Sequence, residues 1–114
     1  MKLNNIIKAL SLRLLQGEGN LVVEVAGGYT SDLLSDVMAR GRKKDIWITL
    51  QTHQNIVAVA KLRELAAVIL VNGRNPDSGT LRKAKEEKVI LLGTDDSAFS
   101  ISAKLYEILR VVSF

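Results

Sequence analysis

Short apolar runs alternate with longer amphipathic segments over the last two thirds of the chain. Val68–Val71 and Val89–Leu92 are wholly apolar, as expected of strands that are covered on both faces of a sheet. Ile46–Leu50 has the composition of a third strand. The segments that follow these runs have helical spacing: residues 56–66, 76–88 and 98–112. Strand and helix in regular alternation predict overlapping βαβ units.

Helix-capping residues support this interpretation. Asn75 has the chemistry of an N-cap, and Pro76 fits the first helical position after it. Residues 94–97 end in the sequence Asp-Asp-Ser, which favours capping of the last helix. That helix repeats apolar residues at three- and four-residue steps, which predicts one core-facing stripe: Ala98, Ile101, Leu105, Ile108 and Val112.

The first third of the chain has a less regular pattern. It predicts a helix over 4–10, a half-buried strand over 11–15 and a turn over 16–20. The β-rich run Leu21–Val25 predicts a second strand, and Ser31 or Asp32 is placed to cap a helix from Leu33 to about Arg40. We therefore expect one α/β domain over residues 1–114, with a mostly parallel sheet between helical layers and a mixed edge.

The composition excludes several classes of protein. Of 114 residues, 47% are hydrophobic and 25% are charged, which is ordinary for one globular domain. Zero cysteines and one histidine exclude disulfides, thiolate catalysis and a histidine cluster. No apolar run approaches the roughly 20 residues of a membrane span, and residues 1–8 are too polar for a secretion signal, so we expect a cytoplasmic protein without a membrane partner.

The net charge of +4 is a mild basic excess. The one basic cluster of the sequence, residues 40–44, contains no aromatic side chain on which a nucleic-acid base could stack. We therefore expect no nucleic-acid partner, and a solvated turn at this cluster.

The first candidate ligand segment is Gly27–Asp32, which is expected to link a strand to a helix. Its backbone amides, with Gly28 and Ser31, have the chemistry to surround an anion at a helix N-terminus. A tight turn followed by an N-cap explains the same residues. The Lys-Ser/Thr pair of a Walker loop is missing, which excludes nucleotide hydrolysis by a P-loop mechanism.

The second candidate is the polar loop 51–55, which includes Thr52 and His53. A histidine such as His53 is suited to contact a ligand or partner, although a solvated or helix-capping loop explains the segment equally. Acid–base chemistry would require His53 to meet Asp32 or Asp36, which the sequence does not establish.

The third candidate is the segment Asn72, Gly73 and Arg74, between an expected buried strand and a helix N-terminus. An arginine there is placed to bind a carboxylate or phosphate through two hydrogen bonds. The alternative is an arginine paired with Asp77 or Asp95.

Three stretches of the chain, residues 27–38, 47–60 and 71–77, resemble the DRTGG domain family over nearly the whole length of the sequence. The resemblance implies a three-layer, Rossmann-like domain similar to the N-terminal domain of bacterial HPr kinase/phosphorylase. Related modules occur in some phosphotransacetylases and in pyrophosphatases with CBS domains, where they are accessory, regulatory or dimerising parts. The family provides no settled set of catalytic residues.

These observations lead to two hypotheses. The first is a stand-alone, non-catalytic regulatory or interaction domain that forms a homodimer or binds a partner protein, and that needs no cofactor or metal. The alternative is a sensor that binds a phosphorylated or nucleotide small molecule at the loops that follow the strands. Its site would be formed by Gly28, Ser31, Thr52, His53, Asn72, Gly73 and Arg74.

Overall fold

A computed structural model describes residues 1–113, with side chains up to Arg110. The helices and strands follow one another along the chain as α1 (Leu3–Ala9), β1 (Arg13–Gln16), β2 (Gly27–Thr30), α2 (Leu34–Arg40), β3 (Asp45–Thr49), α3 (Asn55–Leu62), β4 (Ala67–Leu70), α4 (Ser78–Glu87), β5 (Leu91–Gly93) and α5 (Ala98–Ser113).

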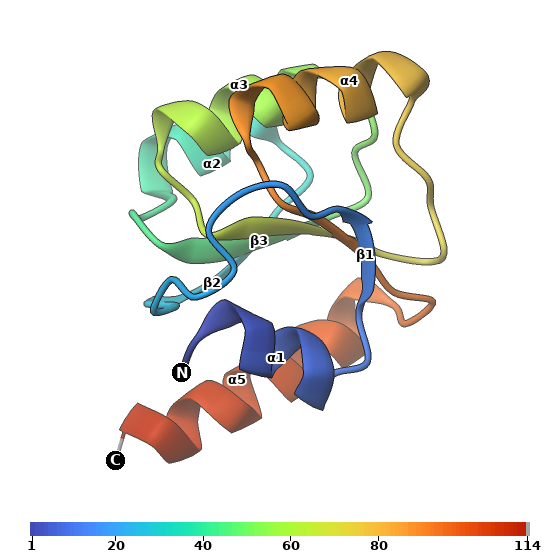
Figure 1. Cartoon of the computed structure of the whole chain (residues 1–114). Helices are drawn as coiled ribbons and strands as arrows, with labels where there is room; N and C mark the ends of the chain where they lie inside the picture. Colours follow the sequence, from blue (N-terminus) through green and yellow to red (C-terminus); the bar gives the residue numbers. More distant parts are fainter. Residues whose placement is uncertain (114) are drawn as a thin grey trace.

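The strands form one sheet in the order β1-β5-β4-β3-β2. Strands β2, β3, β4 and β5 run parallel to one another, whereas β1 pairs with β5 in the antiparallel direction. Helices α1 and α5 cover one face of the sheet, and α2, α3 and α4 cover the other (Figure 1). The expected α/β fold with three layers and a mostly parallel sheet is therefore confirmed, and β1 makes its mixed edge.

The two faces of the central strands are both buried, which explains their continuous apolar runs. In β3, Ile46 and Ile48 point into the core beneath α1 and α5, while Trp47 between them packs into the core beneath α2, α3 and α4. In α5, the predicted stripe holds at Ile101 and Leu105, which are buried, and at Ala98 and Ile108, which are partly buried. The last position of that stripe, Val112, lies outside the described side chains.

The prediction of a strand at Leu21–Val25 is wrong. This segment starts in a turn and bonds to the start of α1: the amides of Leu3 and Asn4 donate to the carbonyls of Val23 and Leu21 at 3.0 and 2.8 Å. Its backbone groups are thus satisfied outside the sheet. The strand is instead made by Gly27–Thr30, which begins two residues after Val25 and was expected to be a loop.

Two predicted helix boundaries are also wrong. The helix after β4 begins at Ser78 rather than Pro76, because the amide of Asp77 donates to the carbonyl of Thr52 in the neighbouring loop and Asp77 stays extended. The helix predicted to reach residue 66 ends at Leu62. Two residues later, Glu64 adopts a left-handed backbone with φ of 53°. That turn directs the chain into β4. Within the described part of the chain, no helix has the length and apolar character needed to cross a bilayer.

Candidate functional site

The loops that follow the parallel strands meet at one edge of the sheet, which we call the strand-end rim. Six of the seven candidate residues lie on these loops. Ser31 follows β2, Thr52 and His53 follow β3, and Asn72, Gly73 and Arg74 follow β4. The carboxyl ends of parallel strands always share one edge, so the strand order alone brings these residues together.

Asp32 joins the first two loops of the rim. Its Oδ1 atom accepts hydrogen bonds from the Thr49 hydroxyl and from the Leu50 amide, both at 2.9 Å. The Ser31 hydroxyl accepts from the Leu33 amide at 3.2 Å, and the Ser31 carbonyl accepts from the indole of Trp47 at 2.8 Å. Ser31 therefore holds the turn before α2. The prediction that Ser31 or Asp32 caps this helix is wrong, because the N-cap is Leu33 and no side chain makes a capping bond to the helix start.

The loop after β3 is held against α4. The Thr80 hydroxyl donates to the carbonyl of Thr52 at 2.7 Å. His53 Nδ1 lies 3.0 Å from Asp77 Oδ2, and 72% of the His53 side chain is exposed. A hollow of about 430 Å³ lies beside this pair, between the first turns of α3 and α4.

The structure does not bring Asp32 or Asp36 to His53. Asp32 is bonded to Thr49, and the Asp36 carboxylate accepts from the Tyr29 hydroxyl at 2.8 Å. The Asp36 carboxylate raises the pKa of Tyr29 above its usual value of 10.0, because the hydrogen bond stabilises the protonated phenol. The carboxylate that orients His53 is Asp77, which the sequence reading assigned only to Arg74.

The loop after β4 is bonded to the loop after β5. The amides of Asn72 and Gly73 donate to the carbonyls of Asp96 and Thr94 at 2.9 and 2.8 Å. Gly73 has φ of 67°, and a Cβ there would lie 3.1 Å from Asp95 Oδ1, so glycine suits this turn on both counts. The rim is thus a continuous series of hydrogen-bonded loops from β2 to β5.

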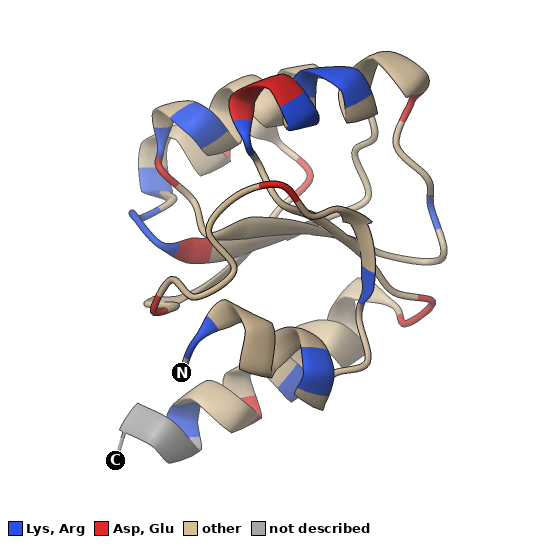
Figure 2. Cartoon of the chain, viewed as in Figure 1, with Lys and Arg blue, Asp and Glu red and all other residues tan. Residues whose placement is uncertain are grey.

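The charges at the rim are mixed. Arg13 pairs with Asp95 at 3.0 Å and Lys104 pairs with Asp96 at 2.8 Å. Arg74 is exposed and forms no ion pair within the described part of the chain, so neither Asp77 nor Asp95 is its partner. Figure 2 shows acidic and basic positions intermixed in the loops at this edge. Within the described part of the chain, Arg74 is therefore a cation at this edge that remains available to an anion.

The seventh candidate, Gly28, is not in a loop, which corrects the sequence prediction. It lies inside β2, where a Cβ would approach Leu105 Cδ2 of α5 to 2.9 Å. A side chain at this position would require the end of the Leu105 side chain to move. The peptide of Gly28 is nevertheless exposed, because β2 is the last strand of the sheet and α5 leaves part of it uncovered.

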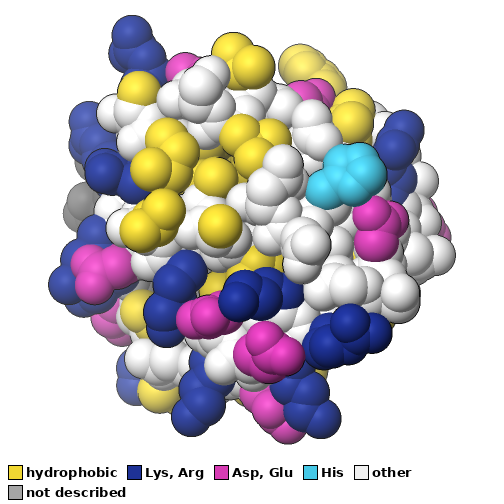
Figure 3. Space-filling model, turned by 90° about the horizontal axis from the view of Figure 1, so that it is seen from above, with side chains coloured by type: hydrophobic (Ala, Val, Ile, Leu, Met, Phe, Trp, Pro, Cys, Tyr) yellow, Lys and Arg dark blue, Asp and Glu magenta, His cyan; other side chains and the backbone are white. Residues whose placement is uncertain are grey.

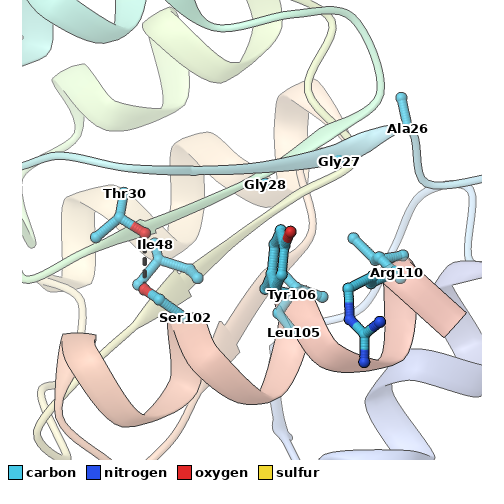
Figure 4. Close-up of a pocket in the computed structure, with 10 residues that line it drawn as sticks. Ala26, Gly27, Gly28, Thr30, Ile48, Ser102, Leu105, Tyr106 and Arg110 are labelled. Atoms are coloured by element: carbon cyan, nitrogen blue, oxygen red, sulfur yellow. Dashed lines mark hydrogen bonds between the residues drawn. The ribbon is translucent and has the colours of Figure 1, made fainter.

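A groove of about 570 Å³ opens between β2 and α5 at this position, and we call it the β2–α5 groove. Among its lining residues are Gly28, Thr30, Ile48, Ser102, Tyr106 and Arg110 (Figure 4). The hydroxyls of Thr30 and Ser102 lie 2.7 Å apart and join strand to helix at one end. Tyr106 extends from α5 toward the strand, and Arg110 follows one helical turn later.

The sequence reading missed the residues that α5 contributes to this groove. Tyr106 directly follows the buried Leu105, and 68% of it is exposed. A large aromatic residue at the margin of a buried helical stripe was the available signal. Arg110 donates to Glu107 at 2.8 Å, and this charge-assisted bond raises the pKa of the guanidinium.

No three side chains among His, Asp and Glu gather to form a metal-ligand cluster in residues 1–110.

Comparison with known proteins places the chain by its fold. No protein-family model matches the sequence, and no curated protein matches it either.

The solved structures include a similar three-layer domain in a regulatory protein. It is found in the crystal structure of the CBS and DRTGG domains of the regulatory region of Clostridium perfringens pyrophosphatase, complexed with the activator diadenosine tetraphosphate. The TM-score is 0.70 and 18% of the residues are identical. The match covers 91% of this chain and 45% of that chain, so this chain spans less than half of the regulatory region.

At this level of identity the likeness establishes the fold. It supports the DRTGG-like fold that the sequence resemblance implies. The similarity to the N-terminal domain of HPr kinase/phosphorylase stays a prediction.

Proposed function

We propose that this chain is a regulatory domain without catalytic activity of its own, and that it acts as a homodimer. The fold it shares with part of a pyrophosphatase regulatory region supports the regulatory role. The rim supports the absence of catalysis, since its carboxylates serve mainly to hold loops together. His53 with Asp77 is an exposed pair beside an open hollow, without a second titratable group placed for proton transfer in the described contacts.

The observation that carries the dimer is an apolar surface on the outer side of two helices. We call it the α2–α3 surface, and its members are Leu34, Met38, Ala58 and Leu62. Leu62 is 69% exposed, Ala58 is exposed, and Leu34 and Met38 are only partly buried. Figure 3 shows apolar side chains gathered over α2 and α3, whereas charged side chains surround α4. Contiguous apolar surface of this kind is typical of a protein contact.

A second copy of the chain is the partner that we assign to this surface. The nearby charges are already paired within the chain, because Asp36 contacts Tyr29 and Arg40, and Lys61 contacts Glu87. A two-fold axis at the boundary between the helices would place α2 of one copy over α3 of the other. The apolar residues of the two copies would then meet at the centre of the contact.

Sedimentation velocity of the whole chain at high micromolar concentration tests the dimer. We expect a species of twice the 12.5 kDa chain mass for the natural sequence and a monomer for Leu62→Lys. Because Leu62 is 69% exposed, its replacement leaves the fold intact, which circular dichroism checks. The matched control is Phe99→Lys, on the opposite helical layer and 86% exposed. A natural chain that stays monomeric, or a control that dissociates as readily as Leu62→Lys, would contradict the proposal.

A second candidate function is sensing of a phosphorylated or nucleotide molecule at the strand-end rim. It is favoured by Arg74, which is unpaired within the described part of the chain, beside the exposed Asn72 and the backbone of Gly73. The similar regulatory region binds a nucleotide activator. A ligand at 100 times its dissociation constant stabilises a fold by about 2.7 kcal/mol. A thermal-shift screen of nucleotides and phosphometabolites therefore detects it, and Arg74→Ala should abolish the shift. An unchanged shift in Arg74→Ala removes the rim from consideration.

A further inference from the structure

The β2–α5 groove combines four kinds of surface within one space. Its base is apolar, formed by Ile48 and Leu105, which are 1% and 2% exposed. One wall is the exposed peptide of Gly28. Opposite this wall, α5 provides the ring of Tyr106, and Arg110 lies at the margin of the groove with its guanidinium turned away from β2 (Figure 4). Such a mixture, in a volume of about 570 Å³, has the character and size of a small-molecule site.

The spacing of the two side chains on α5 selects the chemistry of the ligand. Tyr106 and Arg110 are four residues apart, which places them on one side of the helix with their Cβ atoms roughly 6 Å from each other. A flat ring stacked on Tyr106 would carry an attached anionic group to the guanidinium. Stacking on an exposed aromatic ring and a charge-assisted bond to arginine are both favourable for such a molecule.

The existing partner of Arg110 leaves donors for a ligand. Its described bond joins one nitrogen, Nη2, to Glu107 Oε1 at 2.8 Å. A guanidinium has five N–H donors, so an anion can bind while this pair persists. Glu107 lowers the attraction for an anion, because it neutralises the arginine at close range.

The hydroxyl pair gives the groove a polar end. Thr30 and Ser102 share one hydrogen bond at 2.7 Å, and each hydroxyl keeps further capacity to donate or accept. A ligand with polar atoms on its ring can bond to them while the anionic group lies near Arg110. Both ends of the groove thus offer a polar contact, with the apolar base between them.

We infer that the β2–α5 groove binds a flat aromatic anion of about the size of a nucleoside monophosphate. This site is separate from the α2–α3 surface, which lies on the other helical layer, and from Arg74 at the strand-end rim. The inference therefore does not depend on the homodimer or on the rim sensor. Two kinds of molecule fit this description: a nucleotide and an aromatic carboxylate.

Isothermal titration calorimetry of the whole chain tests the site with defined probes. Adenosine monophosphate combines ring and anion, adenosine lacks the anion, and ribose phosphate lacks the ring. We expect the combined probe to bind about tenfold or more tightly than either fragment, as for two favourable contacts made at once. Indole acetate then separates the two kinds of molecule: binding of the nucleotide alone identifies a phosphate ligand, and binding of both probes identifies aromatic anions in general.

Variants locate the binding. Tyr106→Ala and Arg110→Gln should each weaken the combined probe by about tenfold, since each removes one anchoring contact. Phe99→Ala, an exposed aromatic on the same helix, and Arg40→Gln, another intrahelical ion-pair arginine, are the matched controls and should leave the affinity unchanged. Glu107→Gln should strengthen binding by several fold.

Three results would overturn the inference. The first is no heat of binding for either aromatic anion at millimolar concentration. The second is equal affinity for the complete probe and for its fragments. The third is an affinity that Tyr106→Ala and Arg110→Gln both leave intact. Amide chemical shifts of Gly27 and Gly28 provide an independent readout, because both peptides line the groove.

Discussion

Asp32 is the residue whose removal should most weaken the strand-end rim. The change Asp32→Ala deletes two hydrogen bonds of 2.9 Å, from the Thr49 hydroxyl and from the Leu50 amide. Bonds to a carboxylate contribute about 1.5–3 kcal/mol each when buried, and less at an exposed carboxylate such as this one. Thr49 is 1% exposed, so its hydroxyl would lose its acceptor in a place that water does not reach. We therefore expect a total loss of about 2 kcal/mol.

Urea denaturation followed by circular dichroism measures this loss. With an unfolding entropy of about 2.1 cal/mol/K per residue, a loss of about 2 kcal/mol lowers the melting temperature by about 8 °C. Asp32→Asn keeps the accepting oxygen without the charge, so it should cost about half as much.

A double-mutant cycle separates the bond to Thr49 from the rest. Asp32→Ala leaves the Thr49 hydroxyl without its acceptor, and Thr49→Val removes that hydroxyl. The double variant should therefore lose about 1 kcal/mol less free energy of unfolding than the sum of the two single variants. Glu86→Ala, an exposed carboxylate on α4, is the control and should stay within about 0.5 kcal/mol of the natural chain. Asp32→Ala with an effect as small as this control, or a cycle without coupling, would refute the role assigned to Asp32.

Two further predictions concern single residues. The bond from the Tyr29 hydroxyl to Asp36 raises the pKa of Tyr29, so its stabilisation is complete below pH 10.0, the usual phenol value, and is lost as pH rises through the raised pKa. Thermal melts on both sides of pH 10.0 should therefore show the natural chain losing stability faster than Tyr29→Phe, and parallel curves would disprove this. Lys88 ends α4 in the left-handed region with φ of 58°, so Lys88→Gly should raise the free energy of unfolding by about 0.5–1 kcal/mol in urea titrations, whereas a loss would show that the lysine side chain is needed.

The central part of the fold was predictable from local pattern. Runs such as Val68–Val71 are apolar at every position and short, which is typical of a strand buried on both faces. Ile46, Trp47 and Ile48 then divide between the two cores as the alternation of a strand requires. The carboxyl-edge location of Thr52, His53 and Arg74 followed directly, since it depends on strand direction alone.

The edge of the sheet was not predictable in this way. Leu21–Val25 has the residue types of a strand, yet Val25 is buried and Val23 partly buried against the core from outside the sheet. Gly27 and Gly28 have poor strand propensity and nevertheless form β2, because they pair with Asp45 and Ile46 of β3, while Leu105 of α5 packs against Gly28. This contact joins residues that are far apart in sequence, and no local pattern contains it.

The pairing of His53 with Asp77 was missed for a related reason. The two residues belong to loops after different strands, and their contact depends on the width of the turn before α4. The sequence placed both loops at one edge but gave no measure of which carboxylate would reach the imidazole. Tyr106 and Arg110 were missed because they line a groove between α5 and the edge strand β2. The sequence predicted the wrong segment as this edge strand, so it did not indicate which residues of α5 lie beside it.

Trp47 gives the molecule an internal optical reporter. It is the single tryptophan of the chain, it is fully buried in β3, and its indole N–H donates to the carbonyl of Ser31 at 2.8 Å. Its emission therefore originates from one apolar environment next to the loop that leaves β2. A shift of that emission toward longer wavelength would report water entering beneath this loop, so the native fluorescence follows local opening without any attached dye.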